Sequence, residues 1–135
     1  VIYPKFFEGD QANALDRTFH GSEYGAIVSI RLADDTREAA YRFLNALQLC
    51  TRAASVGDLF TGIVHPATAT HRELSPAKRA EIGITEGLIR ISVGIEDVND
   101  IVADIEQALR AGEAFSRGFS QITLIEETKA ATVGA

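Results

Sequence analysis

The 135-residue chain contains no methionine, no tryptophan and only one cysteine. A single cysteine cannot form a disulfide within the chain, which is typical of a protein from a reducing compartment. No apolar run approaches the roughly 18 residues of a membrane-spanning helix. Residues 1–7 also lack the basic and then apolar pattern of a signal peptide. These absences favour a cytoplasmic location and argue against a membrane partner.

Basic residues are also scarce, because 13 Lys and Arg residues stand against 19 Asp and Glu residues, for a net charge of -6. This acidic balance argues against nucleic acid or an anionic membrane surface as a partner, since both repel negative charge. Composition is otherwise ordinary, with 46% apolar and 24% charged residues. At this length we expect one globular domain with a modest core.

Alternating apolar residues predict several strands. The first covers residues 26–32, where Val28, Ile30 and Leu32 fall on one face. Residues 49–53 and 59–64 are predicted to form two further short strands, because they are rich in residues that suit a pleated sheet.

Helical periodicity and capping residues predict three helices. Residues 37–47 follow the N-cap sequence Asp34-Asp35-Thr36. A short helix is expected from Ser75-Pro76 to about residue 81, since proline suits the first helical position. A longer helix covers residues 97–109, with Asp97 as its N-cap. The apolar stripes of the two long helices are Ala40, Phe43, Leu44 and Leu47, and Val98, Ile101, Ile105 and Leu109.

The order strand, helix, strand, strand, short helix, strand, helix predicts an α+β fold. We expect a two-layer sandwich in which the helices cover one face of a small, mostly antiparallel sheet. Before it, residues 1–7 should be extended and residues 11–18 should form a short helix. The last residues, 130–135, should fray.

The fourth predicted strand lies within Gly87-Leu-Ile-Arg-Ile-Ser-Val-Gly-Ile-Glu-Asp97. Ile89, Ile91 and Val93 form an apolar face, and the other face carries a single charge, Arg90. A guanidinium near a core needs a partner, because burial of an unpaired charge is costly. Arg90 therefore either forms a structural ion pair with one of the acidic residues or grips a carboxylate-bearing ligand through two parallel hydrogen bonds.

This stretch, followed by Asp100 and Asp104, closely resembles the C-terminal signature of the pyridoxal-phosphate (PLP) enzymes of cysteine and methionine metabolism. That family includes the cystathionine γ-synthases, cystathionine lyases, methionine γ-lyases and O-acyl-homoserine sulfhydrylases. Two further motifs agree in order and spacing, and the resemblance runs from about residue 1 to residue 109. These two motifs are Ala54-Ser55-Val56-Gly57 and His65-Pro-Ala-Thr-Ala-Thr-His71.

The resemblance implies roles for three residues. Arg90 corresponds to the arginine that binds the substrate α-carboxylate. Ser55 corresponds to the catalytic serine of the Ser-Leu-Gly motif, which positions the catalytic lysine and contacts the substrate. Thr68 is a weaker candidate for a substrate contact. Judged without the resemblance, Ser55-Val56-Gly57 could equally be a plain turn between two strands.

The resemblance also implies that PLP is bound by residues outside this chain. PLP catalysis requires a lysine that forms a Schiff base and a cup for the phosphate. The lysines here are Lys5, Lys78 and Lys129, and none follows the Ser-x-Thr-Lys pattern of the family. We therefore expect this chain alone to be inactive and to contribute substrate recognition.

The implied domain organisation is that of the C-terminal small domain of a fold-type-I, aminotransferase-like PLP enzyme. Residues 1–25 would be the interdomain lead-in, residues 26–111 the small domain, and residues 112–135 an extension of unknown role. The chain lacks an initiator methionine and begins inside the resemblance, so we expect a fragment of a longer protein. Its partners would be an amino acid substrate, the PLP-binding large domain and further copies in a homo-oligomer.

The reaction implied is elimination or replacement at the β- or γ-carbon of cystathionine, O-acyl-homoserine or a related amino acid. The alternative function, from another class, is a stand-alone ferredoxin-like module that binds a small molecule or regulates another protein. The same strand and helix order suits both, because fold alone does not determine function.

Five other residues invite interpretation. His65 and His71, with only His20 besides, offer too few ligands for zinc, so a ring hydrogen-bonded to nearby backbone is expected at His65. Asp100 and Asp104 lie one helical turn apart and are expected to be solvated on a helix face. Cys50 is expected to be a buried small hydrophobe.

Overall fold

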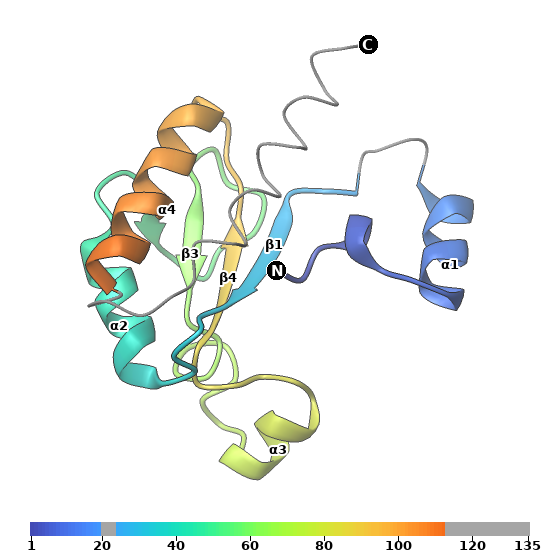
Figure 1. Ribbon diagram of the computed structural model, residues 1–135, viewed down its shortest axis with the longest axis horizontal. Helices are drawn as coiled ribbons and strands as arrows, with labels where there is room; N and C mark the ends of the chain where they lie inside the picture. The colour runs from blue at the N-terminus through green and yellow to red at the C-terminus, as the bar shows by residue number, and fades with distance from the viewer. Residues whose placement is uncertain (20–23, 113–135) are drawn as a thin grey trace.

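The computed structural model describes residues 1–19 and 24–112, in which four strands form one mixed sheet (Figure 1). The strand order across the sheet is β1-β4-β3-β2. β4 runs antiparallel to both of its neighbours, whereas β2 runs parallel to β3. The strands are β1 (Ile27–Arg31), β2 (Thr51–Arg52), β3 (Gly62–Val64) and β4 (Leu88–Ser92). The α+β class is confirmed, and the parallel edge strand makes the sheet mixed.

The helices begin where the capping residues predict. Thr36 Oγ1 accepts a hydrogen bond from Ala39 N at 3.2 Å, and Ser75 Oγ accepts one from Lys78 N at 3.3 Å. Asp97 Oδ1 accepts one from the backbone N–H of Asn99 at 2.7 Å. Each bond satisfies an amide that the first helical turn leaves free. The elements are η1 (Pro4–Phe6), α1 (Asp10–Thr18), α2 (Arg37–Ala46), α3 (Pro76–Glu81) and α4 (Val98–Gly112).

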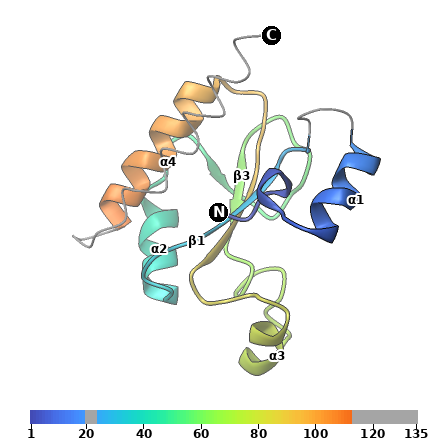
Figure 2. The same cartoon turned by 45° about the vertical axis from the view of Figure 1, so that its right-hand side comes forward.

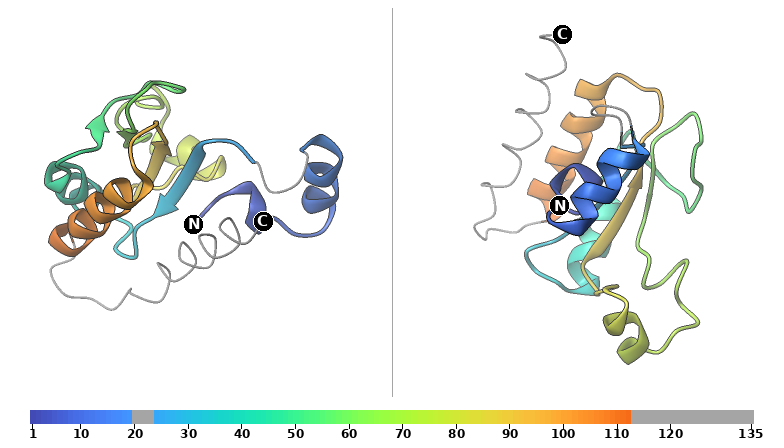
Figure 3. Two further views of the ribbon diagram at one scale, coloured as in Figure 1. Left: turned by 90° about the horizontal axis from the view of Figure 1, so that it is seen from above. Right: turned by 90° about the vertical axis from the view of Figure 1, so that its right-hand side faces the viewer.

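The core forms between α2, α4 and one face of the sheet. The two helices pack side by side (Figures 1 and 2), and both lie on the same side of the strands when the molecule is seen from above (Figure 3). They contribute Phe43, which is 1% exposed, and Ile101, which is 5% exposed. The strands contribute Ile63, Ile89 and Ile91, all buried in the same cluster. The predicted apolar face of β4 is therefore correct.

The start of α4 departs from the predicted stripe. Val98 is 53% exposed, whereas Ala108 is fully buried in the cluster. Ile105 and Leu109 pack against the cluster as expected. The first turn of α4 therefore lies beyond the packed core, and the prediction that Val98 belongs to it is wrong.

β2 and β3 are shorter than the strands predicted over residues 49–53 and 59–64. Side-chain carboxylates accept hydrogen bonds from the backbone N–H groups of the residues just before them. The backbone N–H groups of Leu49 and Cys50 donate to the carboxylate of Asp104 instead of to a neighbouring strand. Thr61 N donates to the Glu96 carboxylate at 2.7 Å. Pairing is left to Thr51–Arg52 and Gly62–Val64.

The amino-terminal segment is not uniformly extended, contrary to the prediction for residues 1–7. Ile2 forms an antiparallel bridge with Ser29, but Pro4–Phe6 then turn into η1, since proline is suited to the first position of a helix. The predicted helix over 11–18 is present as α1, which contains no buried residue. Residues 20–23, and the predicted extension and frayed end within 113–135, lie outside the described residues. None of the helices in the described part of the chain is long and apolar enough to cross a bilayer.

Truncation of core residues should separate the true stripe of α4 from its exposed start. We expect Ile101→Ala and Phe43→Ala each to lower the free energy of unfolding by about 2–5 kcal/mol, because both leave a cavity. Val98→Ala is the matched control and should lower it by less than about 1 kcal/mol. Urea denaturation of the three variants measures this, and equal losses at Ile101 and Val98 would contradict the assigned core.

Candidate functional site

Arg90 lies at the middle of β4, on the face opposite to Ile89 and Ile91. Its Nη2 donates to Ala54 O at 2.7 Å and lies 3.5 Å from Ser55 O. Both acceptors are backbone carbonyls of the segment that follows β2. Within residues 1–19 and 24–112, no carboxylate forms an ion pair with Arg90. The structural ion pair that the sequence left open is therefore not formed.

Residues 54–57, here called the Ser55 turn, lie beside Arg90. Gly57 has a φ of 74°, a conformation that side chains disfavour, which explains the glycine of the Ser-x-Gly motif. Its backbone N–H donates to Ser92 Oγ at 3.2 Å. Ser55 Oγ and Arg90 Nε are both buried and have no hydrogen-bond partner in the described part of the chain. Buried polar groups are nearly always paired, so these two atoms mark a place that an added ligand or protein segment would complete.

The residues after the turn are hydrogen-bonded to the segment that follows β4. Ile95 N donates to Leu59 O at 3.0 Å. The Glu96 carboxylate accepts from Thr61 N at 2.7 Å and from Thr61 Oγ1 at 2.9 Å. Hydrogen bonds from the Thr61 N–H and from the backbone N–H of Glu96 itself lower the pKa of Glu96. Burial acts in the opposite direction, and the hydrogen bond from the Thr61 hydroxyl adds a lesser lowering of the pKa.

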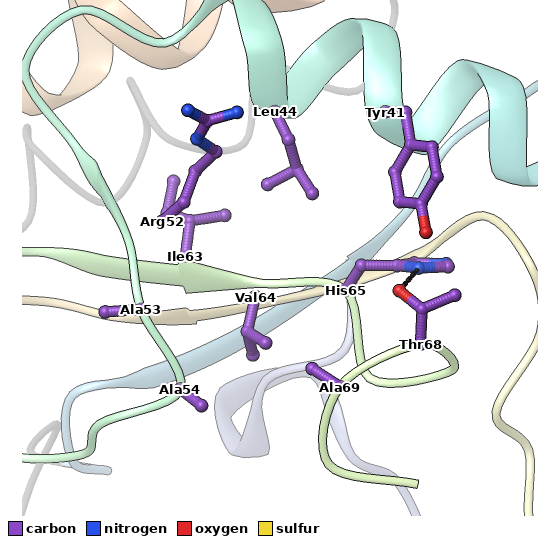
Figure 4. Close-up of a pocket in the computed structure, with 10 residues that line it drawn as sticks. All are labelled: Tyr41, Leu44, Arg52, Ala53, Ala54, Ile63, Val64, His65, Thr68 and Ala69. Atoms are coloured by element: carbon purple, nitrogen blue, oxygen red, sulfur yellow. Dashed lines mark hydrogen bonds between the residues drawn. The ribbon is translucent and has the colours of Figure 1, made fainter. Parts of the chain in front are cut away.

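A groove of about 230 Å³ lies at the β2–β3 edge, between α2 and the turn that follows β3 (Figure 4). Thr68 lines it, and its Oγ1 lies 2.8 Å from His65 Nδ1. His65 Nε2 lies 2.7 Å from Glu86 O, which confirms the expected bond from this ring to backbone. The wall is completed by Tyr41, Leu44, Arg52, Ala53, Ala54, Ile63, Val64 and Ala69.

The structure thus brings Ser55 and Arg90 together but puts Thr68 in a different set of contacts. No hydrogen bond in the described part of the chain joins Thr68 to Arg90 or Ser55. His65 has both ring nitrogens engaged by the protein. Among residues 1–19 and 24–112, no group of three or more His, Cys, Asp or Glu side chains could hold a metal ion.

Asp104 is a residue that sequence reasoning misjudged, because it is 6% exposed and not solvated on a helix face. Its carboxylate accepts the backbone N–H groups of Gln48, Leu49 and Cys50 at 2.7–2.9 Å, together with the side-chain amide of Gln107 at 2.8 Å. Burial acts to raise its pKa, but these hydrogen bonds prevail and hold the pKa of Asp104 below its usual value. Asp100, one helical turn away, is exposed as predicted.

Cys50 is buried, as predicted, and is 5% exposed. Burial, followed by the hydrogen bond and charge of Asp104, raises the pKa of its thiol to about 12. A thiol with such a pKa is protonated near neutral pH and is a poor nucleophile. Cys50 therefore belongs to the core and not to a catalytic site.

Comparison with known proteins identifies the family of this chain. Residues 1–110 match the family described as Cys/Met metabolism PLP-dependent enzymes. The chain belongs to this family. The resemblance seen in the three sequence motifs is thereby confirmed, and the stand-alone regulatory module is not favoured.

Individual members of the PLP-dependent family show how much of the chain is shared. L-methionine gamma-lyase of Pseudomonas putida is 53% identical over 73 residues, which cover 54% of this chain and 18% of that protein. O-succinylhomoserine sulfhydrylase of Pseudomonas aeruginosa is 43% identical over 90 residues, covering 67% of this chain and 22% of that protein. The chain thus spans about a fifth of the length of these relatives.

A solved structure of the family has the same fold over most of the described residues. It is a putative O-acetylhomoserine (thiol)-lyase of Campylobacter jejuni that contains N′-pyridoxyl-lysine-5′-monophosphate. It is 34% identical with a TM-score of 0.72, and the match covers 80% of this chain and 25% of that one. PLP is therefore the cofactor of the family.

The residues described in this chain do not fit PLP by themselves. Lys78 Nζ is bound to both carboxylate oxygens of Glu81, at 3.0 and 2.9 Å, on the surface of α3. Lys5 lies in η1, near the amino terminus, and Lys129 lies outside the described residues. Neither described lysine contacts the Arg90 and Ser55 side chains, so we derive no step of PLP chemistry from this chain.

Loss of the Asp104 charge should destabilise the domain in a pH-dependent way. Asp104→Asn removes one acceptor of several buried N–H groups, and we expect a loss of about 1.5–3 kcal/mol near neutral pH. Because the folded pKa is depressed, the stabilisation by Asp104 is present above about pH 4 and is lost as the pH falls through the folded pKa. Urea denaturation at several pH values should show the difference between wild type and Asp104→Asn shrinking in acid.

Asp100→Asn is the matched control, because Asp100 is an exposed aspartate on the same helix. Its effect on the free energy of unfolding should stay below about 0.5 kcal/mol. A pH-independent effect of Asp104→Asn, equal to that of Asp100→Asn, would contradict the structural role assigned to the Asp104 carboxylate.

Proposed function

We propose that this chain is the substrate-binding C-terminal part of a longer PLP-dependent enzyme of sulfur amino acid metabolism. In that enzyme an amino acid such as cystathionine or an O-acyl-homoserine undergoes elimination or replacement at its β- or γ-carbon. The observation that carries the proposal is the guanidinium of Arg90, which pairs with no carboxylate of the described residues and lies against the Ser55 turn.

Arg90 has the geometry to receive a carboxylate. Its hydrogen bonds to described residues run through Nη2 alone, so that Nη1 donates to no described atom and forms, with Nη2, the end-on pair of donors for a ligand. A carboxylate accepts two parallel hydrogen bonds from such a fork, which is stronger and more directional than a contact with an ammonium group. The α-carboxylate of an amino acid would supply the missing negative charge beside Arg90.

Ser55 is the proposed catalytic partner, since its buried Oγ has no hydrogen-bond partner among residues 1–19 and 24–112. A lysine of the large domain, or the bound amino acid, would provide that partner. For Thr68 we retain a substrate contact as a proposal, and the groove that it lines beside Ala54 leaves space for part of a substrate.

The surroundings of the site support a covering large domain. Val56, Leu59 and Ile95 are 62%, 70% and 79% exposed, and the hydrogen bond between Ile95 N and Leu59 O brings two of them together. Clustered exposed apolar side chains are typical of a surface that a partner covers. We infer that the PLP-binding domain lies against this end of the sheet.

We propose the following organisation for this part of the longer enzyme. Residues 1–25 would be the lead-in from the large domain, residues 26–111 a two-layer sandwich with Arg90 on its helix-free face, and residues 112–135 an extension. We propose a cytoplasmic homo-oligomer, in which the sheet face that carries Arg90 is turned towards the cofactor.

Substitution of Arg90 should weaken amino acid binding more than folding. In the longer enzyme, Arg90→Lys should raise the KM for amino acid substrates by roughly 10- to 100-fold, because an ammonium cannot reproduce the bidentate contact. The visible absorption of bound PLP should be unchanged. Arg31→Lys on β1 is the matched control and should leave KM unchanged, because Arg31 is exposed. A large loss of stability with unchanged KM would make Arg90 a structural residue.

The 135-residue chain on its own should not hold PLP as a Schiff base. After incubation with PLP and reduction by borohydride, peptide mapping should find only slow, substoichiometric labelling of its lysines. One stoichiometric label on Lys5, Lys78 or Lys129 that an amino acid substrate displaces would overturn the assignment of cofactor binding to residues outside this chain.

A further inference from the structure

We propose that Ser92 is a positioning residue, whose hydroxyl sets the place of the Ser55 turn and thereby leaves the free edge of Arg90 available to a carboxylate. This inference rests on the proposed function of Arg90 and adds to it a residue that touches neither substrate nor cofactor. It starts from one part-buried hydrogen bond, between Gly57 N and Ser92 Oγ, at 3.2 Å.

Ser92 is placed to act on the turn. It is 3% exposed and lies two residues after Arg90, so that both side chains are on the same face of β4. Its strand neighbours are Ile27 on one side and Gly62 on the other. A hydroxyl buried at the middle of a sheet needs a partner, and the backbone N–H of Gly57 supplies it.

Gly62 and Ser92 lie beneath the Ser55 turn, and both are small residues. A Cβ atom added at Gly62 would lie 3.6 Å from Ser55 Oγ and 3.7 Å from Ser55 O, which is ordinary contact distance. The Ser55 turn therefore rests directly on Gly62, next to the Ser92 hydroxyl. A side chain larger than that of alanine at Gly62 would lift the turn from the sheet.

The turn is gripped on both sides of Ser55 by β4. Arg90 Nη2 binds the carbonyls of Ala54 and Ser55, and Ser92 Oγ binds the N–H of Gly57. Gly57 has a φ of 74°, a conformation that glycine alone holds without strain. Without the Ser92 hydroxyl, Arg90 would be the only side chain of the described residues that hydrogen-bonds the backbone of residues 54–57.

This division of labour explains how Arg90 can serve two purposes. Nη2 of its guanidinium binds the backbone of the turn, whereas Nε has no partner among the described residues. When Ser92 holds the far end of the turn, the Ser55 hydroxyl and Arg90 Nε keep fixed positions for one ligand. When Ser92 is lost, the turn drifts and the contact between Arg90 and Ala54 drifts with it.

A set of substitutions separates the hydroxyl from the size of the side chain. Ser92→Ala removes the hydroxyl without added volume. Ser92→Thr retains it, and Ser92→Val has the same shape as threonine but no hydroxyl. Thr36→Ala is the control, because Thr36 Oγ1 also accepts one backbone N–H, at the start of α2 and away from the turn.

The first measurement is amide hydrogen exchange of Gly57 in the 135-residue chain. We expect exchange about 2- to 10-fold faster in Ser92→Ala and Ser92→Val, which corresponds to the loss of one net hydrogen bond. Ser92→Thr and Thr36→Ala should exchange at the wild-type rate at this position. An unchanged Gly57 rate in Ser92→Ala and in Ser92→Val would overturn the inference, whatever Arg90 does.

The second measurement is steady-state kinetics of the longer enzyme. Ser92→Ala and Ser92→Val should raise the KM for amino acid substrates by about 2- to 10-fold, with the absorption of bound PLP unchanged and Ser92→Thr close to wild type. If Arg90→Lys raises KM while Ser92→Ala and Ser92→Val do not, the positioning role is overturned and the proposed function stands. If Arg90→Lys leaves KM unchanged, the proposed function itself has failed.

Discussion

The structure depends on β4 and the residues that follow it, because this segment organises both faces of the sheet. On one face Ile89 and Ile91 form the floor of the core beneath α2 and α4. On the other, Arg90 and Ser92 hold the Ser55 turn, and Glu96 holds Thr61 beyond it. Residues in alternation along one strand thus join the hydrophobic core to the candidate site. A shift of one residue in register would exchange the two faces.

The candidate site is unusual in electrostatic terms, since among the described residues a half-buried guanidinium has only backbone carbonyls for partners. Carbonyl oxygens relieve part of the cost of removing a cation from water but leave its charge uncompensated. Such a charge is a poor means of stabilising a fold and a good means of binding an anion. Ser55 Oγ, which belongs to the turn, supports the same conclusion. It is buried without a partner among the described residues, as is Arg90 Nε, and buried polar atoms are usually hydrogen-bonded.

A second polar centre, Asp104, has the opposite character. Its carboxylate is fully used by the N–H groups of residues 48–50 and by Gln107, and it joins α4 to the corner between α2 and β2. Because those amides are bound by a side chain, β2 cannot extend back towards α2. The position of the segment that carries Ala54 and Ser55 therefore depends on a carboxylate in a distant helix. The site is built on this corner, where the Asp104 carboxylate fixes three successive backbone N–H groups.

The sequence by itself determined the features that arise from neighbouring residues. Periodicity located β1, β4 and the two long helices, and the N-caps Thr36, Ser75 and Asp97 marked where helices begin, because capping acts within one helical turn. Three spaced motifs determined the family and, through it, the roles expected of Ser55 and Arg90.

Only the tertiary structure decided which of two similar aspartates is buried, since Asp100 and Asp104 differ not in local pattern but in whether amides more than fifty residues away meet them. The exposure of Val98 and the grip of Ser92 on Gly57 were decided in the same way. Contacts between segments far apart in the chain leave no periodic trace in the sequence of either segment.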